Sequence, residues 1–212
     1  MTETALTPLA AEELVAIVTA PFAPKEAADL RHRRVTGAVD LSGRELSGFD
    51  LSGSRFEAPV TLDNAQTRGL SWFRDCRFEA GLSAEGALFG VDLRLDGARL
   101  AGDLTLSKAE LWGALVLDRA ELGGTAFLDA MQVLGSLSCA GTRFDGPVTL
   151  EGTDAFGGFW ADGAEFGSRV TATGMEIHGR TWLRNARFAA GQAGASVSRL
   201  ISQLRMYGYL WS

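Results

Sequence analysis

Acid–base groups and tryptophans occur together in the last third of the sequence. Carboxylates and an imidazole beside aromatic rings can transfer protons, because an apolar setting shifts their pKa values toward neutrality. An enzyme built on such a set would be an isomerase or a cyclase that acts on an apolar substrate by acid–base chemistry, without a metal. The candidate catalytic residues are those around Trp160 and Trp182, namely Asp154, Glu176, His178, Asp162 and Arg180.

No complete catalytic or cofactor motif accompanies these residues in the sequence. The two histidines and two cysteines stand at unrelated positions, so their spacing predicts no metal site. The glycines are spread along the chain and form no phosphate-binding loop, and neither G-x-S-x-G nor a Cys–His pair with an orienting residue is present. We therefore expect no metal and no cofactor, and the sequence favours a binding role over catalysis.

The elements that would position these residues follow from an internal repeat. Leu41, Leu46 and Leu51 recur at every fifth position, and from Phe56 onward the column recurs at every eleventh position, without an insertion. A second apolar column starts at Leu62, and a column of small side chains starts at Ser54, both with the same interval. The first apolar column consists of Phe56, Thr67, Phe78, Phe89, Leu100, Leu111, Leu122, Val133, Phe144, Ala155, Phe166, Ile177 and Phe188.

The pattern inside each unit predicts strands and corners. Apolar or small residues alternate with polar ones, which is the strand period of two, and the helical period of 3.6 fits nowhere in the repeat. Two consecutive outward residues end each unit, and the second is Gly, Asn or Asp in most repeats, residues that tolerate a left-handed backbone at a corner. Two units then make one coil with four short sides, and stacking of the coils buries the apolar columns. The predicted fold is an all-β, quadrilateral β-helix solenoid.

The repeat resembles that of the pentapeptide-repeat proteins. The stretch DLSGRELSGFDLSGSRF, from Asp40 to Phe56, looks like the five-residue units of that family, and ARLAGDLTLSKAEL, from Ala98, looks like its A-x-F-x-G-x-V-x-F variant. The resemblance covers residues 35–188 and departs from the family at Arg44 and Phe49, where a small residue is expected, and in its 5+6 spacing. It implies a right-handed quadrilateral β-helix but no single activity, because fold and function are separate.

The family resemblance also implies a class of partner. Some members protect gyrase, dimerise through their C-terminal ends and mimic DNA when they bind a type II topoisomerase. For this chain the resemblance implies an interaction protein that gives quinolone-type resistance or self-protection. A DNA mimic needs a continuous acidic face, however, and residues 54–188 hold 18 acidic and 13 basic residues in mixed order.

The ends of a solenoid expose its core and need caps. Residues 1–34 are expected to form an N-terminal helical cap, with a helix that starts at Thr7-Pro8 and stops before Pro21. A second short helix is expected between Pro24 and Leu30. The β-helix is then expected over residues 35–190.

The segment 191–212 leaves the repeat and combines helical spacing with a run of large aromatic residues. Such a tail either folds back as a cap or meets a second copy in a homodimer, and the sequence leaves both roles open. The residues that would carry either role are Leu200, Ile201, Leu204, Tyr207, Tyr209 and Trp211.

Large outward apolar residues concentrate on one face if positions two units apart are stacked. A contiguous exposed apolar patch normally marks a binding surface. Three interpretations remain open: one of the termini covers the face, a protein partner or second copy binds it, or it forms a cleft for a small molecule. The residues of this face are Trp72, Trp112, Val116, Leu134, Phe156, Trp160 and Trp182.

Composition limits the function classes further. The net charge of −6 excludes a basic surface for direct binding of nucleic acid. Two cysteines are too few for a disulfide scaffold and fall at inward positions, and no apolar run reaches the roughly 18 residues of a membrane span. We expect a cytoplasmic protein without membrane contact. Its function is that of an interaction protein, with an enzyme on the aromatic face and a structural scaffold as the alternatives.

Overall fold

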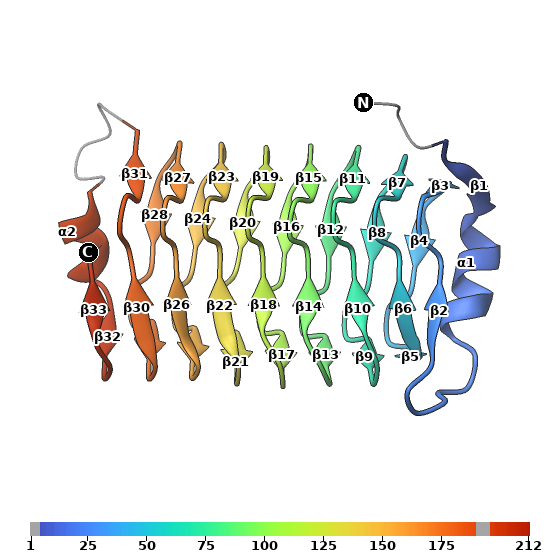
Figure 1. The fold of residues 1–212 in the computed structure, drawn as a ribbon, viewed down its shortest axis with the longest axis horizontal. Coiled ribbons are helices and arrows are strands. Elements are labelled where there is room, and N and C mark those ends of the chain that lie inside the picture. Colours follow the sequence, from blue (N-terminus) through green and yellow to red (C-terminus); the bar gives the residue numbers. More distant parts are fainter. Residues whose placement is uncertain (1–4, 190–195) are drawn as a thin grey trace.

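The computed structural model describes residues 5–189 and 196–212 and shows a solenoid of parallel strands (Figure 1). Its coils are stacked side by side along the long axis, with helix α1 (Ala11–Val18) at the N-terminal end and helix α2 (Val197–Ile201) at the C-terminal end. Strands two repeat units apart pair in register, as Trp72 with Arg94. The expected coil of two units and the all-β solenoid fold are therefore confirmed.

The described strands form four parallel sheets, one for each side of the coil, which we call sheets A, B, C and D. Sheet A contains β1 (Thr7–Ala10), β3 (Arg33–Thr36), β7 (Arg55–Phe56), β11 (Arg77–Phe78), β15 (Arg99–Leu100), β19 (Glu121–Leu122), β23 (Arg143–Phe144), β27 (Glu165–Phe166) and β31 (Arg187–Phe188). Sheet B contains β2 (Ala27–Asp29), β6 (Gly48–Asp50), β10 (Ser71–Trp72), β14 (Leu93–Arg94), β18 (Leu115–Val116), β22 (Ser136–Ser138), β26 (Gly158–Trp160), β30 (Arg180–Trp182) and β33 (Leu210–Trp211).

The chain passes through the four sheets in the order A, C, D, B in each coil. Sheet C contains β4 (Val39–Asp40), β8 (Val60–Thr61), β12 (Leu82–Ser83), β16 (Leu104–Thr105), β20 (Ala126–Phe127), β24 (Val148–Thr149) and β28 (Val170–Thr171). Sheet D contains β5 (Glu45–Leu46), β9 (Gln66–Thr67), β13 (Leu88–Phe89), β17 (Glu110–Leu111), β21 (Gln132–Val133), β25 (Asp154–Ala155), β29 (Glu176–Ile177) and β32 (Arg205–Met206).

The predicted columns line the interior. Members of the first apolar column from Phe56 to Ile177 are buried, and so are the small side chains from Ser54 to Met175. The two cysteines, Cys76 and Cys139, are buried and free, as expected. Burial raises the pKa of both thiols, so the reactive thiolate form is disfavoured at neutral pH.

The corners have the predicted left-handed backbone. From Asn64 to Asn185, the second corner residue of every unit has a positive φ, including three side chains whose type did not predict it: Lys108, Arg119 and Ala130. Alanine lacks the local hydrogen bonds that help Asn and Asp in this region, so Ala130, at φ 53°, is strained.

We expect Ala130→Gly to stabilise the protein by about 0.5–1 kcal/mol, because glycine adopts this φ without a steric cost. Equilibrium unfolding in urea measures the change. The matched control is Ala140→Gly, at the first corner position, where φ is not positive and the substitution should cost about 0.5–1 kcal/mol. Equal effects of the two variants would contradict the assignment of strain to Ala130.

The N-terminal segment corrects two expectations. Thr7-Pro8 starts strand β1 and not the helix, which begins later, at Ala11. Pro8 is compatible with a strand at the end of a sheet, where its missing N–H costs no ladder bond. The second short helix expected between Pro24 and Leu30 is also wrong. That segment contains strand β2, which pairs with β6 and is the first strand of sheet B.

The ends of the core are closed by short elements. Helix α1 packs beside β4 through its buried Leu14 and Val18, and the Val18 carbonyl accepts a bond from the Ser47 N–H. At the other end Leu200 of α2 is buried against the core. The expected boundary between repeat and tail, at residues 190 and 191, lies outside the described residues. No helix of the described residues is long and apolar enough to span a membrane.

Candidate functional site

The aromatic tail forms a last, incomplete coil of the solenoid. Strand β32 pairs with β29, and β33 pairs with β30, so that Glu176 lies beside Arg205 and Trp182 beside Trp211. The step from Trp182 to Trp211 is longer along the chain than the regular step from Trp160 to Trp182, because the intervening chain also holds α2. Over residues 196–212, the tail therefore extends sheets B and D and does not lie over the aromatic face.

This extension builds a stack of three tryptophans on the outer face of sheet B. The ring centroids of Trp160 and Trp182 are 5.4 Å apart, and those of Trp182 and Trp211 are 4.7 Å apart, with the planes inclined by 12° and 13°. The guanidinium of Arg180 lies 5.9 Å from the Trp211 ring, within reach of a cation–π contact. Trp211, on the last strand of sheet B, is the final ring of this stack at the C-terminal end of the rod.

A second stack follows the corner between sheets D and B. The imidazole of His178 lies between the rings of Phe156 and Tyr207, at centroid distances of 4.7 and 4.9 Å. Trp112 and Leu134 continue the same column toward the N-terminus, and 57%, 49% and 42% of Trp112, Leu134 and Phe156 are exposed. We call the six stacked rings the C-terminal aromatic surface: Phe156, His178, Tyr207, Trp160, Trp182 and Trp211.

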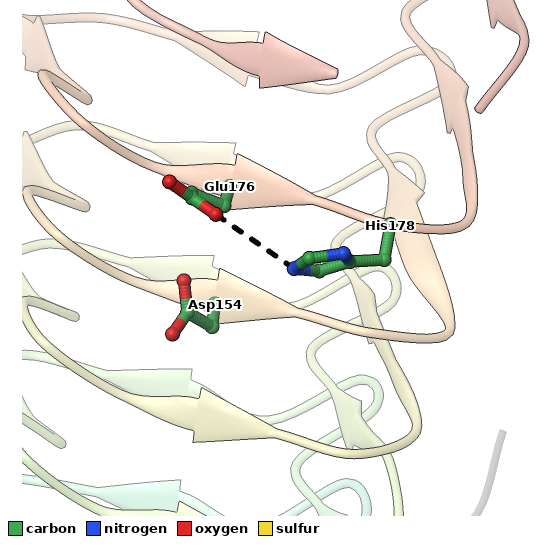
Figure 2. Close-up of side chains that lie close together, drawn as sticks. All are labelled: Asp154, Glu176 and His178. Atoms are coloured by element: carbon green, nitrogen blue, oxygen red, sulfur yellow. Dashed lines mark ion pairs between the residues drawn. The ribbon is translucent and has the colours of Figure 1, made fainter. Parts of the chain in front are cut away.

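The structure brings together three of the five candidate catalytic residues, as Figure 2 shows. Asp154 and Glu176 lie on neighbouring strands of sheet D, in register, and His178 Nε2 lies 3.9 Å from Glu176 Oε2. The tail holds Glu176 from the other side. Arg205 Nη1 lies 3.0 Å from Glu176 Oε1, and the Tyr207 hydroxyl donates a bond of 3.4 Å to Glu176 Oε2.

The other two candidates lie elsewhere. Asp162 follows β26, at the turn between sheets B and A, where it accepts a bond of 3.3 Å from the Asn185 side chain. Arg180 contacts the Trp211 ring. The expected acid–base group thus divides into the cluster Asp154, Glu176 and His178 and two residues outside it.

Trp72, at the other end of sheet B, belongs to a polar network. The Arg74 guanidinium lies 5.6 Å from its ring, and Arg74 and Arg94 contact Asp96 at 3.0 and 2.9 Å. Burial acts to raise the pKa of Asp96, but the hydrogen bonds from the two arginines outweigh it and hold the pKa below its usual value. Val116 lies between this network and the tryptophan stack, so Trp72 is not part of the C-terminal aromatic surface.

The sequence also contains a second pattern, outside the 11-residue repeat, that predicts how the tail continues the coil. An aromatic residue or histidine precedes a tryptophan by four positions in Phe156/Trp160 and His178/Trp182, and the same pair recurs at Tyr207/Trp211. The recurring pair indicates that Tyr207 and Trp211 occupy the two outward columns again. Arg205, which contacts Glu176, is found by the same alignment.

Comparison with known proteins adds a similarity among solved structures. No protein-family model matches the chain, and no curated protein matches it. Among solved structures, the chain is similar to a trypsin-treated variant of QnrB1, a plasmid-mediated fluoroquinolone resistance protein. The identity is 15% and the TM-score is 0.29, with 82% of this chain and 88% of that chain covered. A similarity at this level does not support a function.

Proposed function

We propose that this protein is an interaction protein that dimerises end to end through its last strands, β32 and β33, and the aromatic side chains on them, and presents the resulting rod to a protein partner. The observation that carries the proposal is the open end of sheets B and D. Strands β33 and β32 are the last strands of these sheets, so each has one edge without a partner strand among the described residues. Exposed strand edges readily pair with another chain.

The side chains at this end are those of an interface. Tyr209 and Tyr207 are 75% and 64% exposed, and Leu210 and Trp211 stand beside them, also exposed. Tyr and Trp are the residues that most often dominate binding energy. The neighbouring end of sheet C is closed, because Gln203 Oε1 accepts a bond of 2.9 Å from the Ala172 N–H. Within the described part of the chain, the segment from α2 to Gln203 thus covers the end of sheet C, while the last strands of sheets B and D keep one unpaired edge.

The charge distribution favours an aromatic interface over mimicry of DNA. On the outer face of sheet A, Arg99 pairs with Glu121 at 3.2 Å and Arg187 with Glu165 at 3.0 Å. The same column also contains Arg55 and Arg77 beside Arg99, so this face is not continuously acidic, as a DNA mimic requires. The resemblance to pentapeptide-repeat proteins supports a type II topoisomerase as the first partner to test, with the C-terminal end of the solenoid as the contact that forms the rod.

Light scattering of the full chain tests the dimer. We expect twice the 22.5 kDa of one chain for the wild type and a single chain for the double variant Tyr209→Ser/Trp211→Ser. Each lost interface aromatic should cost about 2 kcal/mol, roughly 30-fold in the dissociation constant. Trp112→Ser is the matched control, because Trp112 is also an exposed aromatic residue but lies in the middle of the rod. A wild-type monomer would reject the dimer.

A supercoiling assay with bacterial gyrase and a quinolone tests the partner. The wild-type protein is expected to restore supercoiling, and the double variant to lose this effect in proportion to its loss of dimer. A dimeric wild type without any effect on gyrase would reject the topoisomerase as partner while the dimer stands.

A further inference from the structure

Two carboxylates stack directly on each other in the outer column of sheet D. In this column, from β17 to β32, the neighbours are Glu110, Gln132, Asp154, Glu176 and Arg205. Only one neighbouring pair in this column combines two like charges. This pair is Asp154 beside Glu176, and like charges directly opposite each other on adjacent strands are destabilising.

A second acidic pair in register shows how the protein balances such a contact. Asp29 and Asp50 are neighbours on sheet B, and Arg31 lies 2.7 Å from Asp29 and 3.9 Å from Asp50. At Asp154 and Glu176, the described cation is Arg205, which contacts Glu176 from the strand on its far side. Asp154 forms no ion pair with any of the described residues. Among the described residues, no arginine or lysine therefore contacts both carboxylates as Arg31 contacts both Asp29 and Asp50, and the group that faces Glu176 from this side is the imidazole of His178.

His178 directs a third ligand atom toward the same space, as Figure 2 shows. One ligand atom each from Asp154, Glu176 and His178 lie within 4.8 Å of one another. Ligands of one ion at bond lengths of about 2.1 Å are separated by about 3–4 Å, so small side-chain rotations bring all three to one ion. The 3.9 Å between His178 Nε2 and Glu176 Oε2 is too long for a hydrogen bond but fits two ligands of one ion.

The surroundings hold two of the three ligands in place. The imidazole is stacked between Phe156 and Tyr207, which fixes the plane of its ring. Arg205 contacts Glu176 Oε1, while Oε2 accepts the 3.4 Å bond from the Tyr207 hydroxyl and also faces the histidine. Supporting contacts of this kind orient metal ligands and raise affinity.

We propose that Asp154, Glu176 and His178 bind one divalent transition-metal ion, such as Zn²⁺, at the corner between sheets D and B. One imidazole nitrogen with two carboxylate oxygens suits Zn²⁺ or Mn²⁺, whereas Mg²⁺ and Ca²⁺ prefer oxygen ligands alone. The ion supplies a positive charge to Asp154, which Arg205 does not contact, and water completes its coordination. The sequence grouped these three residues but predicted no metal, because ligands that come from two different coils show no recognisable ligand spacing along the chain.

Calorimetric titration of the full-length, tag-free protein with ZnCl₂ tests the site. We expect saturation at one ion per chain, and at least a tenfold loss of affinity in Asp154→Asn and in His178→Ala. Glu110→Gln is the matched control for the acid, since Glu110 lies in the same column beside another ring and its Oε1 accepts a bond from Trp112 Nε1. His32→Ala is the control for the imidazole, because His32 is the other histidine of the chain and is exposed.

Two outcomes would overturn the proposal. One is the absence of saturable binding by the wild type up to about 1 mM Zn²⁺, the weak end of the range for functional divalent-cation sites. The other is an equal loss of affinity in the control variants, which would indicate scattered surface binding. NMR of the two imidazoles gives an independent measurement: Zn²⁺ should shift the His178 signals and leave those of His32 in place. Asp154→Asn leaves the proposed dimer surface intact, so its mass in solution separates failure of this site from failure of the dimer.

Discussion

Phe78→Ala is expected to lower the free energy of unfolding by about 3–5 kcal/mol, the range for a fully buried phenylalanine. Phe78 is 1% exposed and stacks on Phe56 at a centroid distance of 4.8 Å, with Phe73 at 5.7 Å. The loss of the ring leaves a cavity that the stacked coils above and below cannot fill, because their backbones are fixed by the sheet ladders. Urea unfolding followed by circular dichroism measures the change.

Phe127→Ala is the matched control. Phe127 stands on sheet C with its ring outward and is 36% exposed, so its removal changes little packing and should cost less than about 1 kcal/mol. An equal decrease in the free energy of unfolding for Phe127→Ala and Phe78→Ala would contradict the conclusion that the buried phenylalanine stack stabilises the fold.

Gly135→Ala is the second substitution with a large expected effect. A Cβ at this position would lie 2.6 Å from the carbonyl carbon and oxygen of Gly113 and 2.7 Å from the N of Ala114, all backbone atoms of the preceding coil. Neither the added methyl group nor the backbone of the preceding coil can move away without separating the two coils. We therefore expect the free energy of unfolding to fall by about 3 kcal/mol, at the upper end for overpacking. The column Gly113, Gly135, Gly157 and Gly179 repeats this close contact.

Gly163→Ala provides the comparison, because it adds the same methyl group where no atom lies within 4 Å. Its φ is +67°, so the cost there is conformational alone, about 1–2 kcal/mol. The order of the two losses is the test. A Gly163 variant that is destabilised more than the Gly135 variant would contradict the close contact between coils.

The corner residues show how much of the backbone conformation could be predicted from residue type. Gly163 and its equivalents mark corners because glycine, asparagine and aspartate are known to tolerate a positive φ. The same conformation occurs at Ala130, Lys108 and Arg119, whose residue types do not predict it. There the pairing with the coils on both sides imposes the positive φ. The local preference was predictable, whereas its exceptions depend on neighbours in the adjacent coils.

The N-terminal segment shows the limit of local signals. Thr7-Pro8 is a typical helix start, yet it forms β1, because a strand at that place pairs with β3 along its whole length. The same holds for Ala27–Asp29, whose pairing with β6 replaces the expected helix. In both segments the open edge of a sheet offered hydrogen bonds that a local helix would leave unmade.

The sequence by itself determined the solenoid, its coil of two repeat units and its buried columns, because an uninterrupted period of inward apolar residues can be buried only by stacking. It also placed Asp154, Glu176 and His178 near one another. The tertiary structure alone decided that the tail resumes the coil after α2, so that Tyr207 and Trp211 complete the two stacks and Arg205 contacts Glu176. The physical reason is that the longer step from Trp182 to Trp211 depends on how α2 packs over the end of the core, which the repeat does not specify.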